Sequence, residues 1–329
     1  MKILPAVLFC LFVSACAVGA APTCDEENLR LATEARERAP WTMPDEIFRN
    51  YVLPDTSVGE PHDDWRALFR EKFLPLVRDC ATPTEAAETL NREIWGILGV
   101  RYSPKRDRPD QSPFHSMRIG KASCSGLSIL LVDACRAVGV PARFVGCRWR
   151  NKPGNHSWVE VWDAGEWRHL GAGDGGRANS AWFDADAAQA DPEDPRFAIY
   201  AARAEPTGIS FPLVWIPEGE DSGVPALNVT ARYLRFAEKL PAGTVRVGFS
   251  LRSREGVRLA RDIRVLDARS RRELARGRTR DERFDLNDIL SFPLPRGAEI
   301  LVVPAAAPDR VLAKVVVPDA ETFFALAEN

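Results

Sequence analysis

The chain has 329 residues, of which 45% are hydrophobic and 27% are charged, and its formal net charge at pH 7 is −2. This length and composition predict a soluble globular protein with enough apolar residues for two domains. The near-neutral charge gives no reason to expect nucleic acid or an anionic membrane as a partner.

The N-terminus has the pattern of a signal peptide. Lys2 precedes an apolar run over residues 3–13, which is followed by small residues up to Ala21. This run is too short to span a bilayer, and no later segment has the roughly 20 apolar residues that a transmembrane helix needs. We expect cleavage near residue 21 and hence a secreted or periplasmic protein. In an alternative hypothesis, Val-Ser-Ala-Cys is a lipobox and Cys16 anchors a lipoprotein.

Cleavage at that point leaves an odd number of cysteines, which are Cys24, Cys80, Cys124, Cys135 and Cys147. In an oxidising compartment, an odd number predicts that at least one thiol is unpaired or forms a disulfide between chains. A disulfide between Cys24 and Cys80 is one possible pairing. Neither the cysteines nor the four histidines have zinc-ligand spacing, so we expect no metal and no other cofactor.

The patterns along the chain predict five segments. These are a signal peptide (1–21), an N-terminal helical region (22–115), an α+β core (116–205), a linker (206–228) and a β-sandwich domain (229–329). In the helical region, apolar periodicity and end signals predict helices over residues 25–39, 63–79 and 84–98. Thr82 is typical of a helix N-cap residue, and Pro83 is typical of the first residue of a helix.

The core combines one helix with several strands. Ser123, Cys124, Ser125 and Gly126 lead into an apolar periodic stretch, so the pattern predicts a helix that has Cys124 in its first turn and ends near Val138. Strands are predicted over residues 142–149, 156–162 and 166–170, with a two-residue turn between the last two. A helix followed by antiparallel strands is an α+β arrangement.

After the proline-containing linker, short alternating strands separated by glycine, proline and charged turns predict a small β-sandwich. The tail over residues 320–327 is compatible with a last short helix. The arginine-rich stretch 252–283 is interleaved with acidic residues, and we expect it to be a solvated face.

The position of Cys124 has a chemical consequence. Free backbone N–H groups and the positive end of the helix dipole favour a thiolate, and the same groups can hold an oxyanion. His156 starts a strand two elements later and is the candidate for the base that takes the thiol proton.

Asp174 is the candidate for a third residue, a carboxylate that orients the imidazole. If residues 164–165 form a two-residue turn, His156 faces Gly173 and Asp174 points to the other face of the sheet. A bulge places Asp174 beside His156 instead. In the alternative, Asp174 only begins the turn that follows the strand.

Three stretches resemble the transglutaminase-like superfamily: Cys-Ser-Gly-Leu-Ser from Cys124, Ala-Val-Gly-Val-Pro-Ala-Arg from Ala137, and His-Ser-Trp-Val-Glu-Val-Trp from His156. The resemblance implies a papain-like core and a triad of Cys124, His156 and Asp174. The family commonly has its aspartate directly after the Trp-x-x-Leu strand, where this chain has Gly171. The C-terminal part is similar to transthyretin-like or carboxypeptidase-regulatory-like sandwiches.

The activity implied by this resemblance is acyl transfer on peptide or protein amides through a thioester on Cys124. Water as acceptor makes a peptidase or amidase, which we favour. A lysine amine makes a transglutaminase that crosslinks Gln to Lys, and a catalytically inactive binding module is the remaining alternative. Further candidates for oxyanion or substrate contacts are Gln111, Trp95, Ser125 and Trp158. The expected partner is a peptide or protein substrate, with possible association with the cell envelope.

Overall fold

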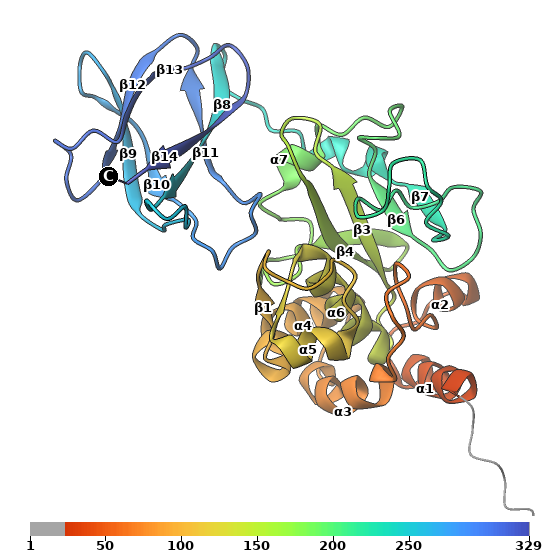
Figure 1. Cartoon of the computed structure of the whole chain (residues 1–329). Helices are drawn as coiled ribbons and strands as arrows, with labels where there is room; N and C mark the ends of the chain where they lie inside the picture. The colour runs from red at the N-terminus through yellow and green to blue at the C-terminus, as the bar shows by residue number, and fades with distance from the viewer. Residues whose placement is uncertain (1–23, 329) are drawn as a thin grey trace, which may run out of the picture.

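The computed structural model describes residues 24–328, so the predicted signal peptide and Cys16 lie outside the described residues. The α+β fold is confirmed, with helices at the N-terminus, a mixed core and a C-terminal sandwich (Figure 1). The N-terminal helices are α1 (Cys24–Arg38), α2 (Asp45–Tyr51), α3 (Trp65–Val77) and α4 (Pro83–Leu98). Within residues 24–328, none of the helices has the length and apolarity to cross a membrane.

The start of α4 follows the predicted capping pattern. Thr82 precedes the helix in an extended conformation, its side chain accepts a hydrogen bond from the N–H of Glu85, and Pro83 is the first helical residue. Proline fits this position because its missing N–H has no partner in a first turn. Gly99 ends the helix in the left-handed region, with φ of 67°.

Helix α6 (Cys124–Ala137) lies at the centre of the core. Every residue from Ser125 to Ala137 is buried, and the helix packs against α3, α4 and the sheet. The sheet has the order β5-β4-β3-β6-β7 and all its pairs are antiparallel. Its strands are β3 (Ala142–Arg148), β4 (Asn155–Asp163), β5 (Glu166–Leu170), β6 (Tyr200–Ala202) and β7 (Ala226–Asn228).

The register of β4 decides which residues face the site. Asp163 pairs with Glu166, so the predicted two-residue turn between β4 and β5 is confirmed, with positive φ at Ala164 and Gly165. At the other end of β4, His156 pairs with Cys147 of β3. Shorter elements complete the core: β1 (Arg101–Tyr102), α5 (Pro113–Ile119), β2 (Lys121–Ala122) and α7 (Asp184–Ala187).

The C-terminal part folds as two packed sheets, β10-β9-β12-β13 and β11-β8-β14. Their strands are β8 (Thr244–Arg252), β9 (Asp262–Asp267), β10 (Glu273–Arg278), β11 (Leu290–Pro295), β12 (Glu299–Pro304), β13 (Ala313–Val316) and β14 (Thr322–Ala327). The core sheet therefore extends to residue 228 through β7, and the first sandwich strand begins at residue 244.

The expectation of a helix over residues 320–327 is wrong. This segment is strand β14, which pairs in parallel with β8 and places Phe324 against Phe249 in the sandwich core. The helical expectation came from a short run that contains several alanines. Tertiary pairing and burial of the aromatic side chains outweigh that local propensity.

Candidate active site

Cys124 is the first residue of α6 and is half-buried. The backbone N–H groups of Ser157 and Ser125 donate hydrogen bonds to its sulfur. The hydroxyl of Ser125 lies 3.2 Å from that of Ser157, so both serines stand beside the thiol. The fold therefore brings the start of α6 against the start of β4, as the order of elements predicts.

His156 is enclosed by aromatic rings. Its imidazole lies beside the stacked rings of Trp149 and Trp158, each with a ring centroid 5.9 Å away, and Trp182 and Phe183 lie at 4.8 and 5.0 Å. The residue is only 5% exposed. Burial lowers the pKa of His156 to about 4, although the charge of Asp285 acts in the opposite direction.

Burial also controls the thiol. It raises the pKa of Cys124 to about 12, the charge of Asp285 adds to this effect, and the donors from Ser157 and Ser125 offset only part of it. The expectation of a thiolate favoured by the helix N-terminus is therefore wrong. At neutral pH, Cys124 and His156 are a neutral thiol and a neutral imidazole.

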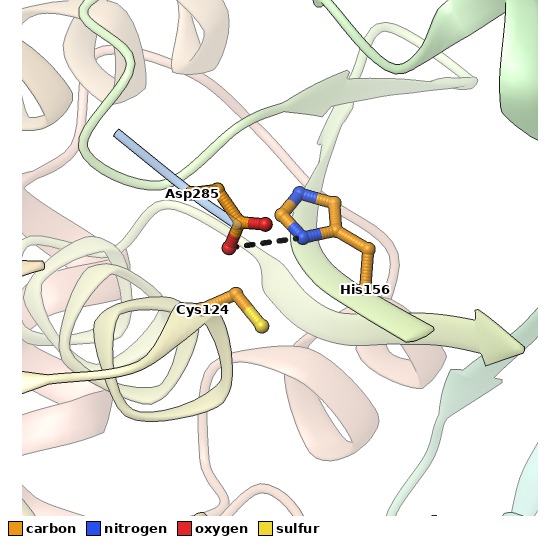
Figure 2. Close-up of side chains that lie close together, drawn as sticks. All are labelled: Cys124, His156 and Asp285. Carbon is orange, nitrogen blue, oxygen red and sulfur yellow. Dashed lines mark ion pairs between the residues drawn. The ribbon is translucent and has the colours of Figure 1, made fainter. Parts of the chain in front are cut away.

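A carboxylate joins this pair from the C-terminal domain. Cys124, His156 and Asp285 each present one donor atom, and these atoms lie within 4.8 Å of one another (Figure 2). Asp285 Oδ2 is 3.6 Å from His156 Nδ1, an ion-pair distance that is longer than a hydrogen bond. Figure 2 shows that the edge of the imidazole that carries Nδ1 faces both the carboxylate and the sulfur.

Asp174 lies in the bend after β5, close to Gly171. A Cβ built on Gly171 meets Asp174 Oδ2 at 1.8 Å, so the Asp174 carboxylate fills the space that a side chain at position 171 would take. Residue 174 is exposed as a whole, yet burial of its carboxyl and then the charges of Asp285 and Asp288 raise its pKa to about 7. In residues 24–328, the carboxylate within ion-pair distance of His156 is Asp285. The role of Asp174 as third residue stays a prediction.

The other candidate residues already have partners for their N–H groups. Gln111 is buried and its Nε2 donates to Ser116 Oγ and to the carbonyl of Lys121. The indole of Trp95 donates to the carbonyl of Asn91. Trp158 is fully buried and donates to Tyr233 Oη, so it contacts the imidazole and is shielded from solvent. The roles of these residues in oxyanion or substrate contacts stay predictions.

The remaining described thiols are free. Cys135 and Cys147 are buried, and Cys80 is half-buried with its sulfur 3.8 Å from Thr89 Oγ1. A free Cys80 does not support the hypothesis of a disulfide to that residue.

Sequence patterns did not predict the contribution of Asp285. It lies in a loop of the sandwich domain, within a charged region that has no local resemblance to a catalytic motif. Trp149 and Trp182, which enclose His156, also lack a distinctive pattern. Their contribution follows only from the packing of three separate segments around one ring.

Comparison with known proteins identifies the core. Residues 73–172 match the family model of the transglutaminase-like superfamily, while no curated protein matches the chain. The match includes Cys124, His156 and Gly171 and ends two residues before Asp174.

Among solved structures, one similar chain is a Cytophaga hutchinsonii protein provisionally described as a cysteine protease, with 16% identity and a TM-score of 0.29. The alignment covers 49% of this chain and 57% of that one. Red sea bream transglutaminase shows 9% identity and a TM-score of 0.32, with coverage of 84% and 60%. This chain thus spans less than two thirds of either protein. On the family match, residues 73–172 are a transglutaminase-like core.

Proposed function

We propose that the protein is a thiol-dependent acyl-transfer enzyme that acts on peptide or protein amides, with Cys124 as nucleophile and His156 as general base and acid. The observation that carries this proposal is the convergence of Cys124, His156 and Asp285, whose donor atoms lie within 4.8 Å of one another inside a transglutaminase-like core. A nucleophile, a base and a carboxylate close to one another are the groups that covalent acyl transfer uses.

The reaction divides into two steps. In the first, the thiol proton passes to His156 while the sulfur bonds to the amide carbonyl carbon, and the tetrahedral oxyanion is held by N–H groups at the start of α6. The intermediate collapses when the imidazolium gives its proton to the departing amine, which leaves a thioester on Cys124. In the second step, His156 takes a proton from water as the water attacks, and the carboxylic acid product leaves with the thiol restored.

The neutral resting pair is compatible with this sequence of steps. Because the pKa values favour the neutral thiol and imidazole, proton transfer must accompany the attack on the carbonyl. An ion pair formed in advance is not required. We propose water as the acceptor, and hence a peptidase or amidase. A lysine amine in its place gives a transglutaminase that crosslinks Gln to Lys.

An inactive binding module is the second candidate function. Two observations favour it: position 171 carries no acid, and burial keeps the thiol protonated. We further propose that residues 1–21 direct export, which the mass of the mature protein isolated from culture fluid or periplasm tests. Retention of the full-length N-terminus would contradict export through cleavage, and a lipid on Cys16 would support the lipoprotein alternative.

The test of activity uses a peptide library together with a labelled primary amine, followed by mass spectrometry. Hydrolysis yields two shorter peptides, whereas transfer adds the mass of the amine to glutamine peptides. The acyl-enzyme is detected as an adduct on Cys124 that hydroxylamine removes. We expect turnover to fall by about 100-fold or more in Cys124→Ala. Cys80→Ala, which removes a thiol elsewhere, is the matched control and is expected to keep wild-type turnover. Equal turnover in Cys124→Ala and wild type, or none in either, would contradict the proposal.

A further inference from the structure

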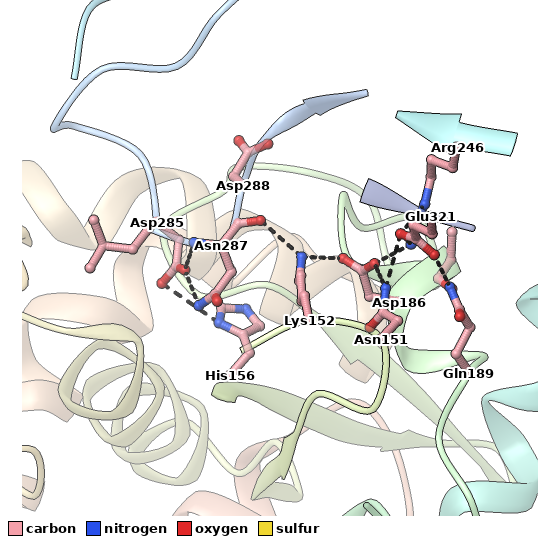
Figure 3. Close-up of polar contacts among 12 residues, drawn as sticks. Asn151, Lys152, His156, Asp186, Gln189, Arg246, Asp285, Asn287, Asp288 and Glu321 are labelled. Carbon is pink, nitrogen blue, oxygen red and sulfur yellow. Dashed lines mark hydrogen bonds and ion pairs between the residues drawn. The ribbon is translucent and has the colours of Figure 1, made fainter. Parts of the chain in front are cut away.

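A loop of the C-terminal domain reaches the candidate active site (Figure 3). It connects β10 to β11 and carries Asp285, which is 7% exposed. Two hydrogen bonds of 2.9 Å hold this loop on the core. The N–H of Leu286 donates to Tyr102 Oη, and the side-chain amide of Asn287 donates to the carbonyl of Asn155. The fold therefore holds the carboxylate of this loop at the active site.

A buried arginine gives the loop its shape. Arg258 is 2% exposed, so the expectation of a fully solvated arginine-rich face is wrong at this position. Its guanidinium donates to backbone carbonyl oxygens of the loop, which belong to Asp281, Phe284, Asp285, Leu286 and Asp288. A loop whose carbonyls converge on one planar cation has few alternative conformations. The loop is thus a rigid support for Asp285.

Buried charges fix the sandwich on the core beside this loop. Lys152 of the core donates to the carbonyl of Asn287 and pairs with Asp186, and Arg246 of β8 also pairs with Asp186. Lys152 and Asp186 are each 5% exposed. Separation of the two domains would leave these buried charges without partners, which is costly. Side chains of the two domains therefore meet at the active site in a fixed arrangement.

Three atoms with lone pairs converge where the domains meet. Cys124, His156 and Asp285 each offer one such atom, and these atoms lie within 4.8 Å of one another. Figure 2 shows that the Nδ1 edge of the imidazole faces both the sulfur and the carboxylate. If the thiol donates its proton to Nδ1, no donor remains for Oδ2 of the carboxylate.

The atoms that converge here are buried and lack hydrogen bonds. Among residues 24–328, Nδ1 of His156 and Oδ2 of Asp285 have no hydrogen-bond partner, although the two residues are only 5% and 7% exposed. Buried polar atoms in proteins normally have partners, so such atoms need an explanation. A cation satisfies all three lone-pair donors at once, which one proton cannot do.

We propose that Cys124, His156 and Asp285 bind one divalent transition-metal ion of the Zn²⁺ type, and that this ion closes the active centre to substrate. The inhibitory effect rests on the proposed function, whereas the binding does not. A thiolate, an imidazole and a carboxylate are the ligands that Zn²⁺ uses in proteins. Ca²⁺ and Mg²⁺ instead prefer sites made of oxygen atoms alone. Thiolate and carboxylate together also balance the charge of a divalent ion.

The spacing of the donors fits tetrahedral zinc. Bonds of about 2.3 Å to sulfur and about 2.0–2.2 Å to nitrogen and oxygen place the ligand atoms about 3.3–3.6 Å apart. Nδ1 of His156 and Oδ2 of Asp285 are already 3.6 Å apart. The sulfur of Cys124 lies at most 4.8 Å from the other two atoms. It must therefore move inward by about 1.2 Å at most, which a side-chain rotation supplies.

The carboxylate of Asp285 is oriented for this role. Its Oδ1 accepts hydrogen bonds of 2.8 and 2.9 Å from the backbone N–H and the side-chain amide of Asn287. These bonds turn Oδ2 toward His156. Hydrogen bonds to a ligating carboxylate are typical of metal sites, because they fix the orientation of the ligand.

A bound ion stops the proposed chemistry. As the sulfur of Cys124 binds the metal, the thiol proton leaves to solvent and the sulfur is no longer available to attack a carbonyl. Nδ1 of His156 is occupied as well, so the imidazole loses the lone pair that accepts the thiol proton. Local spacing of cysteines and histidines could not indicate this site, because its three donors come from segments distant in the sequence.

The first test measures metal binding by the full chain after treatment with a chelator, without substrate. Calorimetry with Zn²⁺ gives the affinity, and we expect one ion per chain. Co²⁺ in its place reports the ligands, because a cobalt–thiolate bond adds a charge-transfer absorption. Asp285→Asn should bind Zn²⁺ about 100-fold more weakly. Cys124→Ser should lose the thiolate absorption.

Two variants are matched controls for binding. Asp288→Asn alters an acid of the same loop whose carboxylate is held by Arg280, and Cys80→Ser removes a thiol elsewhere. Both should match wild type. Equal Zn²⁺ affinity in Asp285→Asn and wild type, or a Co²⁺ spectrum without the thiolate absorption, overturns the inference. If Asp285→Asn does not fold, the comparison of Cys124→Ser with Cys80→Ser decides.

The second test measures turnover over a range of Zn²⁺ concentrations. We expect half inhibition near the dissociation constant from calorimetry and full recovery with a chelator. The remaining turnover of Asp285→Asn should need about 100-fold more Zn²⁺ for the same fractional inhibition. Turnover that rises with Zn²⁺, or that is unchanged at saturating Zn²⁺, overturns the inference. Zn²⁺ binding in a protein that shows no turnover even without metal supports the site and counts against the proposed function alone.

Discussion

The substitution Gly171→Ala displaces the Asp174 side chain without removing its carboxyl group. A Cβ at position 171 falls 1.8 Å from Asp174 Oδ2 and 2.7 Å from its Cγ. Ordinary van der Waals contact between such atoms needs about 3.5 Å, so the carboxyl must rotate away. The backbone accepts alanine, because Gly171 is not among the glycines with positive φ.

The expected change in stability is small. Rotation of the Asp174 side chain costs about 0.5–1.5 kcal/mol if it leaves its preferred rotamer. Replacement of glycine by alanine in a compatible conformation contributes about 0.4–1 kcal/mol in the other direction through the unfolded chain. The two effects nearly cancel, so we expect the free energy of unfolding to stay within about 1 kcal/mol of wild type. The pKa of Asp174 should fall toward its usual range as the carboxyl leaves its buried place and the neighbourhood of Asp285 and Asp288.

Activity is the informative measurement. Because Asp285 is the described carboxylate within ion-pair distance of His156, turnover of Gly171→Ala should remain within about 3-fold of wild type. Thermal unfolding of the same sample confirms that the fold is intact. A loss of tenfold or more in kcat with an unchanged melting temperature would refute this reasoning and assign the orienting role to Asp174.

Three further results are expected. Burial holds the pKa of Cys124 near 12, so its alkylation by iodoacetamide should still be rising from pH 7 to pH 10; a plateau below pH 8 contradicts this. Zn²⁺ should bind the sulfur, imidazole and carboxylate donors and inhibit reversibly, and calorimetry should show that Cys124→Ala loses this binding; unchanged binding there refutes a site at Cys124. Gly139→Ala should lower stability by about 2–4 kcal/mol, because φ is +81° and the new Cβ meets Ala35 O at 2.6 Å. Gly99→Ala, with similar φ and open space, should cost only about 1 kcal/mol; equal melting temperatures for the two variants contradict the steric argument.

Those parts of the fold that depend on local chemistry could be predicted from the sequence. Helix α4 follows from apolar periodicity with Thr82 and Pro83 at its start, and the β4–β5 hairpin follows from Ala164 and Gly165. Both signals act over a few residues. The end of the chain differs, because β14 gains its hydrogen bonds and its aromatic contacts from β8, far away in the sequence.

The pKa of Cys124 shows why the position of a cysteine at a helix N-terminus does not by itself predict a thiolate. A helix N-terminus stabilises a negative charge by about 0.3–1 kcal/mol, and by at most about 2 kcal/mol in partly buried geometries. One pKa unit corresponds to about 1.4 kcal/mol, so this effect lowers a thiol pKa by less than about one unit, and by at most about 1.5 units. The pKa of Cys124 instead rises from 9.0 to about 12, because burial acts in the opposite direction and is larger. The enclosing side chains come from other segments, and their effect is not encoded near Cys124.

The carboxylate beside His156 also could not be predicted from the local sequence. The motif at the end of a strand predicts an acid only at the position directly after the strand. This chain has Gly171 at that position, so the motif does not indicate which acid lies beside His156. Asp285 reaches His156 because Arg258 shapes its loop and because buried charges such as Lys152 and Asp186 fix the sandwich on the core. Each of these contacts joins segments that are distant in sequence. A carboxylate next to His156 can therefore come from either domain, and only the packing of the two domains shows which one supplies it.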